Sequence, residues 1–319
     1  MASDAHASFQ AKVDESADYL SSADAERSFA RDPYWPKWNS PWWHMTLMWE
    51  LGAAKRIPDV ALKRLVDALK TRYIHFFPFT EREIPAGVDP ISGIMCHCGM
   101  GTVYQILRAA GIDVDAELPW MRKWFVQYQM EDGGWNCDEA AYIKAEPKSS
   151  VVSTLPVLES LLCIEDRSQE ETQALDAGAH YLIKRNLVRS MKSADVINDA
   201  WLQLTFPRFY EYDILRGFAF CVNWAKQRNK PLSAEFVDHA VAIIESKIIG
   251  NANDATGLPV ERQYYKTVDT RLKNENGEWT KGPSSEFPLL VWASQIGQIS
   301  PSLTYSWNSA LTDLKRLSH

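Results

Sequence analysis

The sequence predicts an all-α fold, an α/α toroid in which about five to six helical hairpins form inner and outer helix layers. Two observations favour it. Amphipathic and nearly apolar helical segments alternate along the 319 residues, and the alternation repeats about every 50–60 residues, which is typical of stacked helical hairpins. No run of alternating apolar and polar residues bounded by hairpin turns predicts a larger sheet.

Five segments have the pattern of an amphipathic helix. In residues 60–74 the apolar side chains recur three and four residues apart on one stripe, formed by Leu62, Leu65, Val66 and Leu69. The same pattern recurs in residues 116–130, 172–187, 233–248 and 302–317. Because such a helix has one polar face, we expect these five to form the outer layer.

Shorter, nearly apolar segments lie between the amphipathic ones. They are residues 42–51, 101–110, 150–162, 209–225 and 286–296. A helix that is apolar nearly all round must be buried on all sides, so we expect these segments to form the inner layer. Gly52 and Gly111 end two of them 59 residues apart, and Gly297 ends another after three further steps. An open solenoid is the alternative to a closed ring.

Composition narrows the class of protein. No linker rich in Gly, Ser or Pro separates the repeats, so we expect one domain over residues 1–319, with 1–30 as a helical segment packed on it. Lys and Arg number 34 against 41 Asp and Glu, a net charge of −7 that argues against nucleic acid as a partner. No apolar stretch reaches the roughly 18 residues of a membrane helix. The polar N-terminus lacks a signal peptide, and the odd number of cysteines, five, favours a cytoplasmic location.

One segment carries a resemblance to known proteins. Residues 123–135 read KWFVQYQMEDGGW, in which an aromatic helix and a Gln precede Asp-Gly-Gly-Trp. The glycines allow a sharp turn, and the tryptophan can fold back to staple that turn to the next helix. The string resembles the repeat motif of squalene and oxidosqualene cyclases, and similar repeats occur in protein prenyltransferase β subunits. The matching residues are Phe125, Gln129, Asp132, Gly133, Gly134 and Trp135.

This resemblance implies a terpenoid cyclase-like α/α toroid with a single barrel. It also implies that an isoprenoid or another apolar ligand binds in an aromatic-lined central cavity, with catalysis left open. The chain lacks the Asp-x-Asp-Asp run with which such cyclases protonate their substrate. Two other classes therefore remain, a carbohydrate-active α/α-barrel hydrolase or lyase and a non-catalytic lipid-binding or scaffold module with or without a protein partner.

Candidate site residues follow from the geometry of the predicted ring. Parallel inner helices bring all their N-termini, and the positive ends of their dipoles, to one end. The catalytic candidates there are Asp213, Tyr212, His44 and Asp138, and the substrate-binding candidates are Trp42, Trp43, Tyr210, Arg208 and Trp135. Asp213 is either an acid catalyst or one half of an ion pair with Arg216. For the carbohydrate class, Asp138, Glu139, Asp213 and Glu286 could supply an acid and a base.

Three of the five cysteines lie at two neighbouring helix entries, in MCHCGM and GWNCDE. Thiolates and imidazoles are zinc ligands, and a zinc site needs three or four of them to converge. Cys98, Cys137 and His97 are the predicted ligands, with Asp138 as an alternative to His97. Two other states stay open, namely reduced thiols without a metal and a Cys98–Cys137 disulfide. No other cofactor is indicated.

Overall fold

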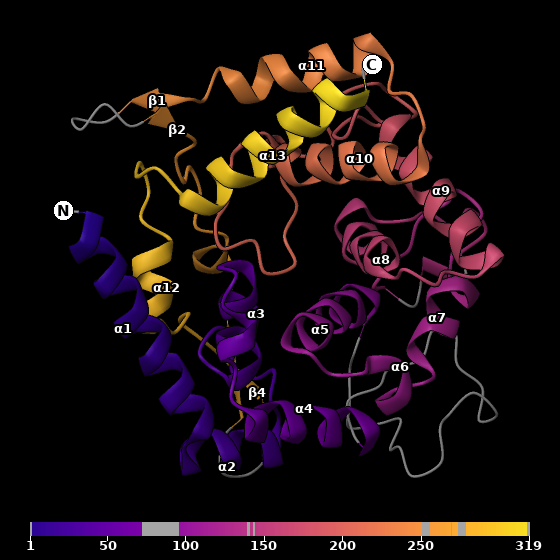
Figure 1. Ribbon diagram of the computed structural model, residues 1–319. Helices are drawn as coiled ribbons and strands as arrows, with labels where there is room; N and C mark the ends of the chain where they lie inside the picture. The colour runs from indigo at the N-terminus through magenta and orange to yellow at the C-terminus, as the bar shows by residue number, and fades with distance from the viewer. Residues whose placement is uncertain are drawn as a thin grey trace.

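The computed structural model describes residues 2–71, 96–138, 141–142, 144–250, 256–268, 270–273 and 279–317. In this part the chain is mostly helical, as the sequence predicts, and it contains 13 α-helices (Figure 1). The strands described form only two small antiparallel pairs, β1 (Ile249–Gly250) with β2 (Thr256–Gly257), and β3 (Thr270–Lys273) with β4 (Trp279–Gly282). None of these helices is both long enough and apolar enough to cross a membrane.

The helices follow the predicted alternation. The apolar segments form α3 (Pro41–Glu50), α5 (His97–Ala110), α8 (Val151–Cys163), α10 (Ile214–Arg228) and α12 (Pro288–Ala293). The amphipathic segments form α4 (Asp59–Thr71), α6 (Val114–Glu117), α7 (Met121–Gln127), α9 (Gln169–Ile183), α11 (Ala234–Glu245) and α13 (Pro301–Leu317). The N-terminal residues form α1 (Ala2–Ser21) and α2 (Ala23–Arg31), and short 3-10 helices are η1 (Ala54–Arg56), η4 (Asp199–Leu202) and η5 (Tyr264–Lys266).

Two of the predicted helices are wrong in their extent. The segment 116–130 divides into α6 and α7 at Pro119, whose ring removes a backbone N–H and restricts the residue before it. Helix α10 begins at Ile214 and not at residue 209, because Phe209 has a left-handed φ of 55° that no α-helix contains. The residues before α10 are therefore a loop, and Asp213 is the N-cap of the helix.

The closest helix contact in the interior lies between α5 and α8. Gly101 faces Pro156 so closely that a Cβ at position 101 would lie 2.4 Å from the Pro156 carbonyl carbon. Ser160 donates a hydrogen bond of 2.6 Å to the carbonyl oxygen of Gly101. Helix α8 in turn contacts α9 and α10, and α10 packs along α13. Small residues therefore bring the apolar helices into direct backbone contact.

The Gly-Gly-Trp turn has the predicted structure. Gly133 has a φ of 96°, which favours glycine, and Trp135 is completely buried. The Trp135 amide donates to Thr154 Oγ1 at 2.9 Å, and its indole Nε1 donates to the Phe125 carbonyl oxygen at 2.9 Å. The ring thus joins the helix before the turn to the helix after it, and the turn carries the chain from α7 to α8.

Candidate functional site

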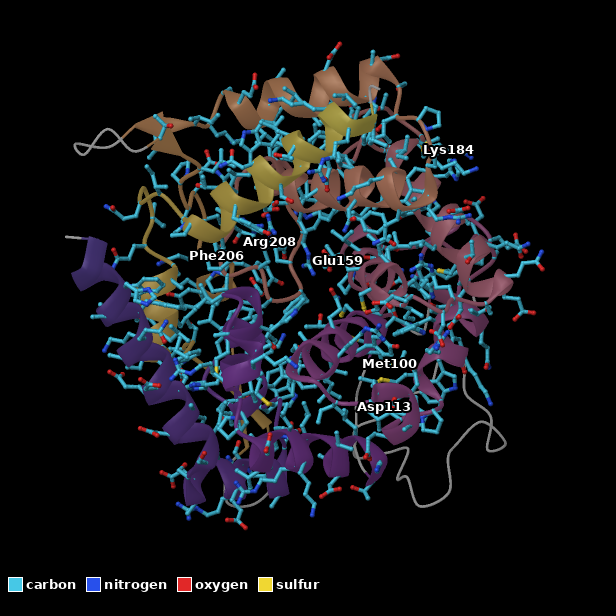
Figure 2. All side chains as sticks on the ribbon, in the orientation of Figure 1. Met100, Asp113, Glu159, Lys184, Phe206 and Arg208 are labelled. Atoms are coloured by element: carbon cyan, nitrogen blue, oxygen red, sulfur yellow. The ribbon has the colours of Figure 1, made fainter. Side chains whose placement is uncertain are left out.

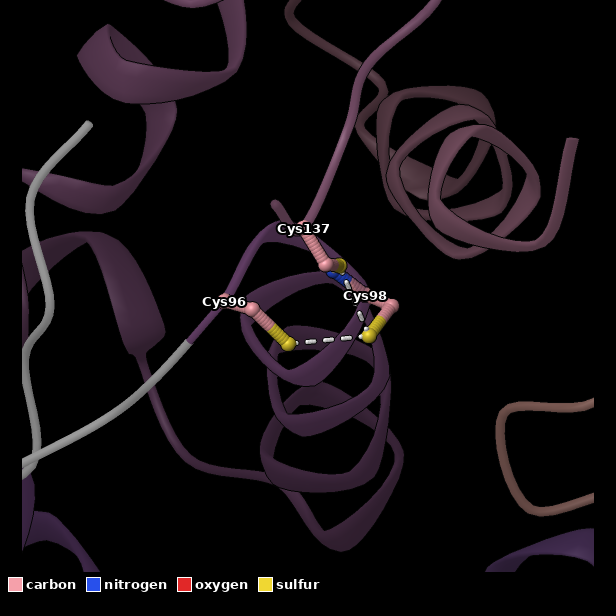
Figure 3. Close-up of side chains that lie close together, drawn as sticks. All are labelled: Cys96, Cys98 and Cys137. Carbon is pink, nitrogen blue, oxygen red and sulfur yellow. Dashed lines mark hydrogen bonds between the residues drawn. The ribbon is translucent and has the colours of Figure 1, made fainter. Parts of the chain in front are cut away.

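Three cysteine thiols converge at the N-terminal end of α5 (Figure 3). Cys96 is the N-cap of the helix, Cys98 lies in its first turn, and Cys137 follows the Gly-Gly-Trp turn. The Cys98 Sγ lies 3.0 Å from the Sγ of Cys96 and 3.1 Å from that of Cys137. We call these residues the thiol cluster. Their three sulfur atoms lie within 4.8 Å of one another, so the cluster could hold a metal ion.

The donor set fits zinc. Tetrahedral zinc binds thiolate sulfur at about 2.3 Å, which places two ligand sulfurs about 3.8 Å apart. The Cys98 Sγ lies less than an ångström closer than that to each of its two neighbours. The number of ligands, three, is that of catalytic zinc sites, which keep a fourth position for water or substrate.

The predicted histidine ligand does not belong to the thiol cluster. His97 is buried on α5 with its Nδ1 3.2 Å from the carbonyl oxygen of Asn136. Burial lowers the pKa of His97 to about 4, so the ring is neutral at pH 7. Cys96 takes the third position instead, because residues 96 and 98 flank the helix start on one side while residue 97 faces inward. The alternative Asp138 is exposed, with Lys144 3.7 Å from its carboxylate.

The protonation of the thiol cluster is uneven. Hydrogen bonds with Cys137 and Cys98 lower the pKa of Cys96 well below its usual value. The pKa of Cys98 is raised by its hydrogen bonds with the other two thiols and by burial, and burial is the main cause of the raised pKa of Cys137. Cys96 is therefore the group that carries a thiolate first, stabilised by two neighbouring S–H groups and by the N-terminus of α5.

An aromatic cage lies beside the thiol cluster and encloses a lysine. The Nζ of Lys37 lies 4.9 to 5.8 Å from the ring centres of Tyr34, Trp35, Trp38, Trp43 and Tyr210. It also donates a hydrogen bond of 2.9 Å to the Tyr210 hydroxyl. Only 8% of Lys37 is exposed, and ring faces at these distances attract a cation. The cage thus surrounds the Lys37 Nζ with ring faces in the protein interior.

The thiols affect the pKa values of two tyrosines of the cage. Removal from water, and then the charges that Cys96 and Cys98 carry when deprotonated, raise the pKa of Tyr34 well above its usual value. The pKa of Tyr210 is also raised, mainly by burial, with a contribution from Cys98. Tyr34 and Tyr210 therefore lie near both the Lys37 Nζ and the thiol cluster.

A separate cavity of about 680 Å³ opens between α3, α5, α8, α10 and α13. Figure 2 shows Phe206, Arg208 and Glu159 in this central region. We call it the central cavity. Trp49 and Glu50 reach it from the end of α3, Gln105 from α5 and Glu159 from α8. It therefore borders the C-terminal halves of these helices, whereas the sequence predicts a site at their N-termini.

The charged groups of the central cavity are paired within the protein. Arg216 contacts both carboxylate oxygens of Glu159, at 2.9 and 2.6 Å. Arg208 Nε donates to Asp213 Oδ2 at 3.2 Å, so Arg208, and not Arg216, forms the side-chain ion pair with Asp213. Arg216 contributes only its backbone N–H, which donates to Asp213 Oδ1 at 2.8 Å. The predicted Asp213–Arg216 pair is wrong because Asp213 caps α10 and Arg216 points away to α8.

Of the predicted substrate-binding residues, Arg208 lines the central cavity. Trp42, Trp43 and Trp135 are buried in the hydrophobic core, and Tyr210 packs in the aromatic cage. The cavity instead takes its aromatic rings from Trp49, Phe206, Phe220 and Tyr305.

The remaining catalytic candidates do not line the central cavity, and two of the named residues, His44 and Glu286, lie together at a small pocket beside Phe287. Tyr212 is fully buried and donates to the Leu187 carbonyl oxygen at 3.1 Å. His44 is buried between Ser16 and Asn39, 3.2 Å from a side-chain oxygen of each. The Glu286 carboxylate accepts a hydrogen bond from Tyr265, and Glu139 lies outside the described residues. The described carboxylates proposed as an acid and base pair thus come from separate places in the fold.

Sequence reasoning missed the residues that organise these sites. The string PYWPKWNSPWW before α3 has the density of aromatic residues around a lysine that an aromatic cage needs, so it contained a usable signal. Glu50 and Glu159 gave no such signal in the sequence, because each is an ordinary acidic residue near the end of an apolar helix. No protein-family model matches this chain, and no curated protein or solved structure shows significant similarity to it.

Proposed function

We propose that this chain is a zinc-binding, terpenoid cyclase-like protein whose helical hairpins close into an α/α toroid, and that it acts on an isoprenoid or another apolar substrate. The convergence of three thiols at the start of α5 carries the proposal. Cys96, Cys98 and Cys137 come from two adjacent hairpins, so their sulfur atoms meet only because the chain folds this way. The isoprenoid substrate is supported by the Gly-Gly-Trp repeat motif and its observed turn.

The surroundings of the thiol cluster favour a charged metal centre. Zinc with three thiolates carries one net negative charge. The N-terminus of α5, where Cys96 is the N-cap, places partial positive charge beside it, which stabilises thiolates over thiols. When bound, the zinc would supply a Lewis acid with a free coordination position for a substrate oxygen or sulfur.

Metal content tests the proposal. Protein purified without a metal-affinity column should contain about one equivalent of zinc by elemental analysis. Cys98→Ser and Cys137→Ser should reduce it to below about a tenth of an equivalent, because two sulfur ligands hold zinc poorly. Cys163→Ser is the matched control, since Cys163 is a free thiol at the other end of α8 and should leave the zinc in place. Wild-type protein without zinc would refute the metal centre.

The substrate class needs its own measurement. Organic-solvent extraction of the purified protein, followed by mass spectrometry, should yield an isoprenoid or another apolar compound. Release of sugar from a polysaccharide panel, with no extracted lipid, would instead favour the carbohydrate-active class.

A further inference from the structure

A second cavity, of about 460 Å³, lies against α12 and is mainly apolar. Phe9 of α1, Leu51, Val260 and Trp292 are among its lining residues, and the Phe9 and Trp292 rings lie 5.2 Å apart. We call it the apolar pocket. Val291 and Ile296, which are the sequence neighbours of the lining residues Trp292 and Gln295, expose 45% and 59% of their surface. Apolar side chains that stay accessible to solvent beside such a pocket suit an apolar ligand.

The apolar pocket and the central cavity share a wall. Phe206 and Ser302 line both of them. Phe206 belongs to the loop before α10, and Ser302 is the second residue of α13. Glu50 holds that loop by accepting hydrogen bonds from the backbone N–H groups of Arg208, at 2.8 Å, and of Phe209. A ligand that passes these two side chains would therefore enter an apolar space at one end and a polar one at the other.

The charges of the central cavity select against an ionic ligand. Arg216 is bound to Glu159, and Lys226 lies 2.8 Å from Asp313. Arg208 is bound to Asp213 through Nε, and its Nη2, which has no hydrogen-bond partner among the described residues, is buried away from solvent. A phosphate or carboxylate entering the cavity would find its cations already neutralised and would approach carboxylates. Such a group loses its hydration without reaching a solvent-accessible positive partner that is unpaired, which is unfavourable.

The cavity nevertheless has free capacity for hydrogen bonds. The side chains of Asn223 on α10 and of Ser302, Ser306 and Ser309 on α13 line it, and Asn223 and Ser309 are exposed to solvent. The three serines recur at intervals of four and three residues, so they occupy one face of α13. Hydroxyls and an amide beside aromatic rings are the groups that bind an uncharged, hydroxyl-rich ligand.

We propose that the two cavities form one site for an amphiphile, with its apolar chain in the apolar pocket and an uncharged, hydroxyl-rich head in the central cavity. The inference rests on the proposed function only for the expectation of an apolar chain, and it does not involve the thiol cluster. It narrows the ligand to a neutral lipid-like molecule and makes a diphosphate the wrong head group.

Calorimetric titration of the full-length protein with n-octyl β-D-glucoside, below its micelle concentration, tests this site. Methyl β-D-glucoside has the same head without the chain, and octyl sulfate has the same chain with a charged head. Each buried methylene strengthens binding about fourfold, so we expect octyl glucoside to bind at least tenfold more tightly than methyl glucoside. It should also bind more tightly than octyl sulfate. Equal or tighter binding of octyl sulfate, equal binding of methyl glucoside, or no binding of octyl glucoside would each overturn the proposal.

Substitutions locate the binding. Ser302→Trp fills the shared wall and should weaken octyl glucoside binding at least tenfold. Asn308→Trp is the matched control on the same helix, because Asn308 is exposed and lines neither cavity. Gln295→Trp narrows the exposed mouth of the apolar pocket and provides a second variant if Ser302→Trp does not fold. Unchanged affinity in the folded variants would place the ligand elsewhere and refute the site.

The result separates this inference from the proposed function. In Cys137→Ser protein, octyl glucoside should bind with unchanged affinity even where the zinc is lost. Zinc-free wild-type protein that still binds the glucoside would refute the metal centre and leave the amphiphile site standing. Zinc-containing protein that binds no glucoside would refute the amphiphile site and leave the metal centre standing.

Discussion

Arg216 on α10 and Glu159 on α8 form a two-point ion pair, with Nε to Oε1 at 2.9 Å and Nη2 to Oε2 at 2.6 Å. The two partners differ in burial, since 5% of the arginine side chain and 19% of the carboxylate side chain are exposed. The pair therefore joins two helices at the wall of the central cavity, and the arginine is more deeply buried than the glutamate. A buried ion pair adds little net stability to a protein, but removal of one partner strongly lowers the free energy of unfolding.

Glu159→Ala should lower the free energy of unfolding by about 3–5 kcal/mol, because it leaves the Arg216 guanidinium buried without its carboxylate. Arg216→Met should cost less, since the cavity lets water reach Glu159. Chemical denaturation of both variants measures the difference. Glu15→Ala, which removes an exposed pair with Lys12, is the control and should change stability by less than about 1 kcal/mol. Equal losses in the two cavity variants would contradict the proposed difference in solvation.

Trp135→Ala should lower the free energy of unfolding by about 3–5 kcal/mol. The ring is completely buried, and its loss also removes the hydrogen bond to the Phe125 carbonyl oxygen. Trp120 is only partly buried, so Trp120→Ala serves as a comparison and should cost markedly less. A loss below about 1 kcal/mol at Trp135 would mean that the Gly-Gly-Trp turn does not depend on its tryptophan.

Asp213→Ala should destabilise the protein by about 3–5 kcal/mol, because it removes the cap of α10 and leaves Arg208 without its carboxylate. Asp213→Asn keeps an acceptor for the Arg216 backbone N–H and should cost less. Asp113→Ala removes an exposed cap from α6 and should cost about 1 kcal/mol. Thermal and chemical unfolding check this order. If Asp213→Asn were as stable as wild type but inactive in an isoprenoid assay, that result would favour a catalytic role for Asp213 over a structural one.

Periodicity predicted the helices well, because an apolar stripe has to face a core wherever that core lies. The start of α10 was missed, since the left-handed φ of Phe209 depends on Glu50, which binds the backbone of Arg208 and Phe209 from more than 150 residues away. No local pattern contains that contact. The sequence also could not choose between Arg208 and Arg216 as the partner of Asp213 without knowing where α10 begins.

The candidate site was predictable only where its residues lie close together along the chain. Cys96 and Cys98 are two residues apart, and Cys137 follows a recognisable turn, so the thiol cluster could be inferred from the sequence. The choice of His97 over Cys96 as the third ligand was wrong, because the sequence does not show in which direction each side chain points at the start of a helix. The central cavity was not predictable, since Glu159 and Arg216 are ordinary until two helices meet.

The stability of the protein should fall with acid in part through His44. Burial lowers the pKa of His44 from 6.5 to about 3. Between these values the unfolded chain binds a proton at this ring and the folded chain does not, so the neutral ring contributes stability above pH 6.5. That contribution is lost as the pH falls toward 3, with a slope of up to about 1.4 kcal/mol per pH unit.

His44→Gln should remove this dependence. We expect the loss of unfolding free energy between pH 7 and pH 4.5 to be smaller in the variant than in wild type by about 2–3 kcal/mol. Urea denaturation at several pH values measures it. His97, whose pKa is also lowered, to about 4, contributes in the same direction in both proteins and cancels from the comparison. Parallel curves for the two proteins would show that His44 is protonated in the folded chain, despite its stacking on Phe287 with ring centres 3.7 Å apart.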